Sequence, residues 1–98
     1  MNIIIDDKVK ERLRMMGKKS ITVYTAAVGS CWSPRPEIFV RLNEPVARDK
    51  YDMFEVDGIN IYLYKEAELT DDTLRIEPAK YVSDLADKEF DVHGLKLD

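Results

Sequence analysis

The sequence has only one cysteine, one histidine and one tryptophan among its 98 residues. A single cysteine excludes an internal disulfide framework and any four-cysteine metal site within one chain. No apolar run is long enough to span a bilayer, and no charged-then-apolar leader opens the chain. There is no phosphate-binding glycine loop, no Cys-x-x-Cys pair and no Ser-His-Asp set that the one histidine completes. We therefore expect a reduced, cytoplasmic protein that is not an enzyme and does not contact a membrane.

The charged residues are nearly balanced, with 15 Lys and Arg against 19 Asp and Glu, for a net charge of −4. Apolar residues make up 45% of the chain, as in ordinary globular proteins. This length supports one domain, 1–98, around one core. The negative net charge disfavours phosphate contacts, so we expect no nucleic-acid partner. A basic first segment and an acidic last segment favour attraction within the chain or between two copies, which makes a homodimer one candidate state.

One amphipathic helix is predicted near the start of the chain. Asp6-Asp7 is a natural helix start, and Gly17 is well placed to end the helix. Val9, Leu13 and Met16 recur at i, i+4 and i+7, which puts them on one helical face. We expect this face to cover a sheet.

The hydrophobic period then changes to two, which predicts about six short strands. Asp57-Gly58 supplies the positive φ angles of a tight hairpin between 53–56 and 59–64. Tyr62 and Tyr64 share one face of the second strand and apolar residues the other, which favours a central strand or an interface. The remaining predicted strands are 21–24, 38–40, 74–76 ending at Pro78, and an alternating segment from Phe90. Residues 81–86 are ambiguous between helix and strand.

Cys31 is the main candidate for chemistry. It follows a strand at a point where Gly29 loosens the backbone and Pro34 and Pro36 are expected to forbid regular pairing. Arg35 is close in sequence and favours the thiolate form. Two interpretations stay open, a functional thiol on a loop and a buried structural cysteine.

Three weaker candidates remain. His93 has a solvated side chain or serves as a ligand or base, with the first interpretation favoured. Trp32 is either a partner anchor or a plug that fills its own loop. The acidic residues from Glu66 to Asp72 lack the ligand spacing of a calcium loop, which favours a solvated turn.

The order of these features resembles a known family. A short strand and an amphipathic helix come first, followed by four characteristic segments. These are Gly29-Ser30-Cys31, Pro36-Glu37-Ile38-Phe39-Val40, Val56-Asp57-Gly58-Ile59 and Val92-His93-Gly94-Leu95. The chain resembles the HesB-like domain of A-type iron–sulfur carriers, and most closely the short HesB-related branch that includes selenoproteins.

This resemblance implies a fold and a role. The fold would be mainly β with one N-terminal helix (α+β), built as a HesB-like pseudobarrel with a mixed sheet. Cys31 would occupy the loop of the family's first conserved cysteine and bind the cofactor. A symmetric dimer would offer two such thiolates, and a bridging cluster would then need other ligands, such as His93 or an external thiol. The tail lacks the Cys-x-Cys of true carriers. An iron–sulfur cluster, iron or no cofactor all remain open, and the implied partners are iron–sulfur or sulfur-transfer proteins. The alternative is a non-metal binding or assembly module with a structural Cys31.

Overall fold

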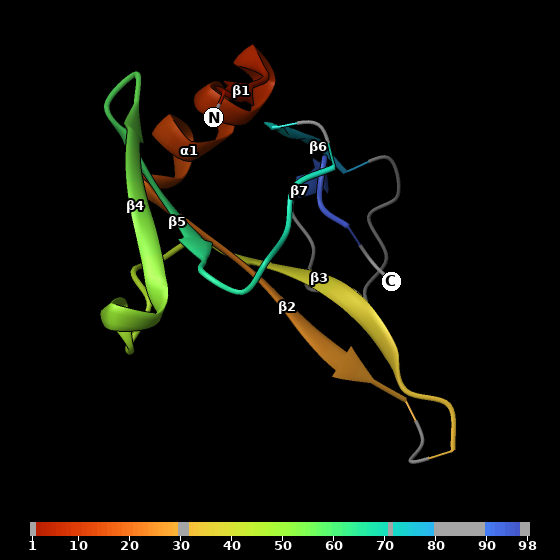
Figure 1. Cartoon of the computed structure of the whole chain (residues 1–98). Helices are drawn as coiled ribbons and strands as arrows, with labels where there is room; N and C mark the ends of the chain where they lie inside the picture. The colour runs from red at the N-terminus through yellow and green to blue at the C-terminus, as the bar shows by residue number, and fades with distance from the viewer. Residues whose placement is uncertain (1, 30–31, 71, 80–89, 97–98) are drawn as a thin grey trace.

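A computed structural model describes residues 2–29, 32–70, 72–79 and 90–96. The described chain contains one α-helix, one short 3-10 helix and seven strands in two sheets (Figure 1). The helices are α1 (Asp7–Met16) and η1 (Arg48–Lys50), and the strands are β1 (Asn2–Ile5), β2 (Ser20–Val28), β3 (Arg35–Arg41), β4 (Tyr51–Val56), β5 (Ile59–Tyr64), β6 (Thr73–Pro78) and β7 (Phe90–His93). The six strands expected from the period of two are present, and β1 is the short strand that precedes the helix. The ambiguous segment 81–86 lies outside the described residues.

Both sheets mix parallel and antiparallel pairs. The larger has the order β3-β2-β5-β4, with β2 parallel to β5 and the other neighbours antiparallel. The smaller has the order β1-β6-β7, with β1 parallel to β6 and β7 antiparallel to it. The predicted α+β class with mixed sheets is confirmed. The described strands form two separate sheets and no closed barrel, so the HesB-like pseudobarrel remains a prediction.

Helix α1 has the ends that its sequence predicts. The Asp6 side chain accepts a hydrogen bond from the Lys8 backbone N–H at 2.8 Å, and Gly17 closes the helix in the left-handed region with φ 69°. Val9 and Leu13 are buried and the helix contacts β6, which confirms that it covers a sheet. The expectation for Met16 is wrong, because its side chain is 39% exposed. It lies at the last helical position, and the buried residues of the helix are Val9 and Leu13.

The predicted hairpin at Asp57-Gly58 is confirmed. Both residues have positive φ, and β4 pairs with β5 from Val56–Ile59 outward. Strand β5 lies between β2 and β4, so the expected central strand is also confirmed.

Strand β3 corrects one expectation. Pro36 does not prevent pairing, because it lies inside β3 opposite Ala27 of β2. The physical reason is the position of β3 at the edge of its sheet, where a residue without an N–H is tolerated. The β2–β3 hairpin is therefore longer than the sequence predicted, and it extends well past the other strands (Figure 1).

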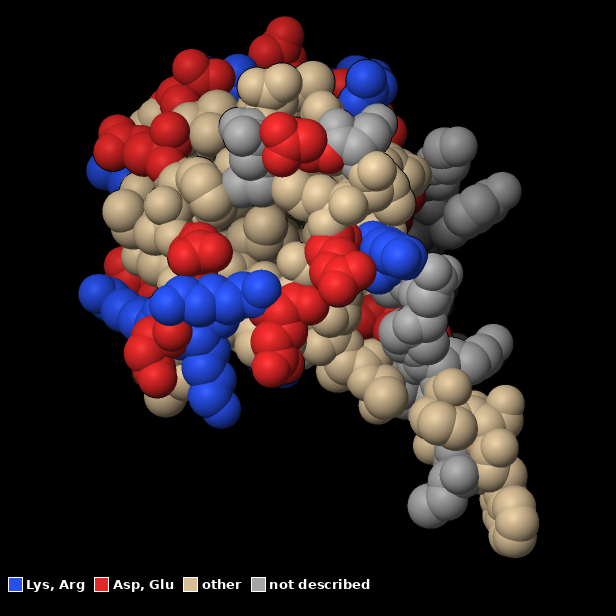
Figure 2. All heavy atoms as spheres, in the orientation of Figure 1, with Lys and Arg blue, Asp and Glu red and all other residues tan. Residues whose placement is uncertain are grey.

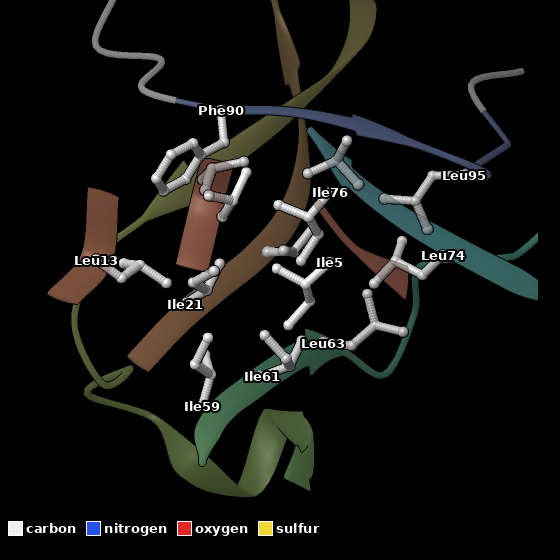
Figure 3. Packing of buried hydrophobic residues seen from close by; sticks show 14 residues of the cluster. Ile5, Leu13, Ile21, Ile59, Ile61, Leu63, Leu74, Ile76, Phe90 and Leu95 are labelled. Atoms are coloured by element: carbon white, nitrogen blue, oxygen red, sulfur yellow. The ribbon is translucent and has the colours of Figure 1, made fainter. Parts of the chain in front are cut away.

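The core lies between the two sheets and helix α1. Figure 3 shows side chains from both sheets and the helix pointing toward one another. Phe90, Leu74, Ile76, Ile61 and Leu13 are at most 2% exposed. Burying a side chain of this size contributes roughly 1.5–3 kcal/mol to folding. Within the described residues, no helix has the length and apolar character needed to cross a membrane.

Candidate functional site

The main candidate residue, Cys31, and its neighbour Ser30 lie outside the described residues. The chain on either side is described. Strand β2 ends at Val28 and β3 begins at Arg35, so the segment between them joins the far ends of the long hairpin. Gly29 has φ 108°, and a side chain there would come within 3.1 Å of the Ser33 carbonyl oxygen. The turn into the cysteine segment therefore requires glycine at this position.

Trp32 lies at the end of this hairpin, which projects from the charged body of the protein (Figure 2). Its side chain is 94% exposed. The interpretation of Trp32 as a plug for its own loop is therefore wrong, because a plug would be buried. A role as a partner anchor stays a prediction.

His93 is the last residue of β7, in the smaller sheet. Its Nε2 lies 3.4 Å from Oε2 of Glu77 on β6, and both side chains are about half exposed. This contact becomes an ion pair only when the imidazole is protonated. The favoured interpretation of a solvated histidine agrees with this exposure.

The described residues contain no group of three or more His, Cys, Asp and Glu side chains that could hold a metal ion. His93 therefore has Glu77 beside it but no third ligand within that part of the chain. Cys31 is outside the residues searched, so its role as a ligand remains a prediction.

A second candidate site lies on the larger sheet, on the face away from the core. Val23 and Leu63 point into the core, and the residues that alternate with them on β2 and β5 point outward. Thr22 is nevertheless only 2% exposed, because segment 43–47 folds over this face. The Thr22 hydroxyl donates a 2.6 Å hydrogen bond to the Asn43 carbonyl and so holds the segment down. A cavity of about 490 Å³, open to solvent, lies between the segment and the sheet.

Three tyrosines from three strands line this cavity. The rings of Tyr51 and Tyr64 are 5.6 Å apart and tilted by 53°. Tyr24 stacks on Phe39 with the ring centroids 5.2 Å apart, and its hydroxyl accepts a 3.2 Å hydrogen bond from Nε of Arg41. These contacts hold the rings in fixed orientations.

The local surroundings raise the pKa of two of these phenols above 10.0. Burial is the main cause for the pKa of Tyr51, which the nearby Tyr24 also raises and the positive charge of Arg41 partly lowers. For Tyr64 the main cause is the 2.8 Å hydrogen bond that its hydroxyl donates to Glu66, whose charge raises the pKa further. Both phenols are therefore neutral hydrogen-bond donors near pH 7.

Only one feature of this cavity was indicated by the sequence. The outward aromatic face of β5 pointed to an interface, and Tyr64 lines the cavity. Arg41 and Lys50 carry no local pattern that marks them as neighbours. The fold brings them together because β3 and η1 flank the same face of the sheet.

Comparison with known proteins gives one match. The model of a family described as the CC/Se motif containing family matches residues 1–83. The chain belongs to the CC/Se motif containing family. No curated protein and no solved structure matches the chain.

The match to the CC/Se motif containing family includes some of the candidate residues and leaves out others. Cys31 lies inside the matched range, as do all the residues that line the cavity. His93 lies beyond residue 83 and outside the match. The match therefore covers the cysteine hairpin and the cavity, and not the histidine.

Proposed function

We propose that the protein is a non-enzymatic accessory protein of iron–sulfur cluster or sulfur metabolism that acts through the thiol of Cys31. The observation that carries the proposal is the family match, whose description names a CC/Se motif. Cys31 is the only cysteine in the chain, so it is the one residue able to supply the sulfur of such a motif. Ser30 precedes it, so the chain has Ser-Cys where a cysteine pair would stand. The HesB-like resemblance, with its cysteine loop, supports the same role.

The position of the cysteine segment supports transfer to a partner. It joins the ends of two strands that extend past the body, and the adjacent Trp32 is exposed. The Cys31 thiolate would attack a disulfide sulfur of a partner protein, forming a mixed disulfide and releasing one partner thiolate. A second thiol must then attack the mixed disulfide, because the chain has no other cysteine to do so. The proposed partners are therefore cytoplasmic iron–sulfur or sulfur-transfer proteins.

An iron–sulfur cluster does not fit the ligands of one chain. Such clusters are normally held by four protein ligands, mainly thiolates. One chain supplies a single thiolate and a single imidazole. A homodimer would bring two Cys31 thiolates and would still need ligands from His93 or from external thiols. We therefore derive no step through a cluster and leave its presence to experiment.

The first experiment is anaerobic reconstitution with iron and sulfide, followed by visible absorption and metal analysis. The variants are Cys31→Ser and His93→Asn. A chromophore that disappears in Cys31→Ser would identify a cluster carrier, and its loss in His93→Asn as well would make the histidine a ligand. A folded wild-type protein without chromophore is the expected result for action through the thiol alone.

The thiol itself is tested by its alkylation rate as a function of pH. Action through Cys31 requires a thiol pKa below the ordinary value of about 8.5, because the thiolate is the nucleophile. Denatured protein provides the matched reference for the same cysteine. A native alkylation rate far below the denatured one at every pH would show a buried, structural cysteine and contradict the proposal.

The alternative function is a non-metal binding or assembly module with a structural Cys31. The exposed Trp32 and the cavity lined by tyrosines favour it. Size-exclusion chromatography with light scattering tests the homodimer form of this module. A dimer that persists in Cys31→Ser would support assembly without the thiol, and a strict monomer at high concentration would contradict it.

A further inference from the structure

The cavity on the larger sheet offers hydrogen-bond donors more than acceptors. Tyr24 accepts a bond from Arg41, and a hydroxyl that accepts one bond retains its own proton to donate. Within the described part of the chain, neither the Tyr51 hydroxyl nor the Lys50 ammonium has a hydrogen-bond or ion-pair partner. The Lys50 ammonium has three N–H groups that can donate hydrogen bonds, and it cannot accept any.

The carboxylates near the cavity are already neutralised or hydrogen-bonded. Glu44, which lines the cavity, forms an ion pair with Arg48, four residues further along the chain. Glu66 accepts a hydrogen bond from the Tyr64 hydroxyl. Lys50 therefore supplies a positive charge to the lining, although the whole chain is negative. This arrangement disfavours a cation between the tyrosine rings, because the charge of Lys50 would repel it.

The size and walls of the cavity define the rest of the ligand. A volume of about 490 Å³ is within the range of small-molecule sites, about 300–1,000 Å³. Three aromatic rings favour a ligand with a flat π surface, and such rings prefer offset or tilted contacts. Donors and positive charge favour an acidic group on that ligand.

We propose that this cavity binds a small molecule in which a planar ring carries a carboxylate or phosphate group. The ring lies among Tyr24, Tyr51 and Tyr64, and the acidic group faces Lys50. The site does not use Cys31, so it goes beyond the proposed thiol function and can be tested separately from it.

The test uses four probes in two matched pairs, each titrated to about 10 mM into isotope-labelled protein and followed by two-dimensional NMR. Benzoate is compared with neutral benzamide, and phenyl phosphate with neutral phenol. We expect the anions to shift the backbone amides of Thr22, Tyr24, Tyr51 and Tyr64, and to bind about tenfold more tightly than their neutral partners. The two anions together show whether the site prefers a carboxylate or a phosphate.

Variants locate the acidic group. Lys50→Gln should weaken binding of the preferred anion about tenfold, and Tyr51→Phe should weaken it less because the ring is kept. Lys18→Gln removes an exposed cation outside the cavity and serves as the matched control. Amide shifts outside the cavity, no shift with either anion, or equal effects of Lys50→Gln and Lys18→Gln would each overturn the proposal. Cys31→Ser should bind the probes as the wild type does, whatever the outcome for the thiol.

Discussion

Gly94 lies directly against the carbonyl group of Thr73, so that a Cβ at position 94 would overlap the Thr73 carbonyl oxygen. Gly94 also has φ 104°, a conformation that side chains rarely adopt. Its carbonyl accepts a 2.8 Å hydrogen bond from the Thr70 backbone N–H. This one residue therefore ties the end of β7 to both the start of β6 and the chain before it.

The first prediction concerns this contact. Gly94→Ala should lower the free energy of unfolding by about 3 kcal/mol or more. The Thr73 backbone must move away from the new Cβ, and the alanine must also adopt a strained φ. Gly17→Ala is the matched control, since Gly17 has φ 69° but nothing within 4 Å of the added Cβ. It should cost only about 1–2 kcal/mol. Urea unfolding measures the free energy of unfolding of both variants. Equal decreases in the two variants would show that the close approach to Thr73 adds nothing to the cost of the substitution.

The second prediction concerns Lys10 of α1 and Asp57 of the β4–β5 turn, which are joined by a hydrogen bond and ion pair. The hydrogen bond to Asp57 is the main cause that raises the pKa of Lys10 above 10.5. Because the folded-state pKa is the higher one, this stabilisation is complete below about pH 10.5 and is lost as the pH rises through the folded value.

A double-mutant cycle with Lys10→Met and Asp57→Asn measures this pair. The coupling should be present at neutral pH, shrink in about 1 M salt, and disappear above the folded-state pKa of the lysine. Coupling that survives both treatments would contradict an electrostatic origin.

The third prediction concerns the phenol of Tyr64. Glu66→Gln should lower the pKa of Tyr64 toward 10.0, because it replaces the carboxylate that accepts the Tyr64 hydrogen bond and whose charge opposes ionisation. The pKa of Tyr51, raised mainly by burial, should change little. Absorption by tyrosinate during an alkaline titration measures both, and Tyr64→Phe assigns the steps. Since both phenols have raised pKa values when folded, stability should fall as the pH rises above about 10.

The fourth prediction concerns Trp32. Because its side chain is 94% exposed, acrylamide should quench its fluorescence nearly as well in the native protein as in urea. It is the only tryptophan, so the signal reports on the hairpin end alone. Strong protection of the native protein at low concentration would contradict the exposed position. Protection that appears only with a partner would identify Trp32 as part of the interface.

Features set by local chemistry were predicted well from the sequence. The Asp6 cap, the Gly17 end and the Asp57-Gly58 turn each depend on a few adjacent residues, and all three are confirmed. The buried faces of α1 and β5 were predicted from the spacing of apolar residues, which is also a local property. Met16, at the end of the helix, is the exception because it is exposed.

Features set by pairing between distant segments were not predictable in this way. Ile3 of β1 pairs with Leu74 of β6, and neither segment has a sequence pattern that identifies the other as its pairing partner. The tolerance of Pro36 depends on β3 being an edge strand, which is a property of the whole sheet. The cavity likewise needs Arg41, Lys50 and the tyrosines to meet from separate elements.

Pro36 has a consequence for how the protein behaves in a crowded solution. An edge strand with an unbroken row of donors and acceptors is a template on which further chains can add and grow into fibrils. Strand β3 contains Pro36, and proline on an edge strand hinders pairing with a further strand because it has no N–H to donate. We therefore expect this long two-stranded arm to be a poor template for strand addition by other copies of the chain.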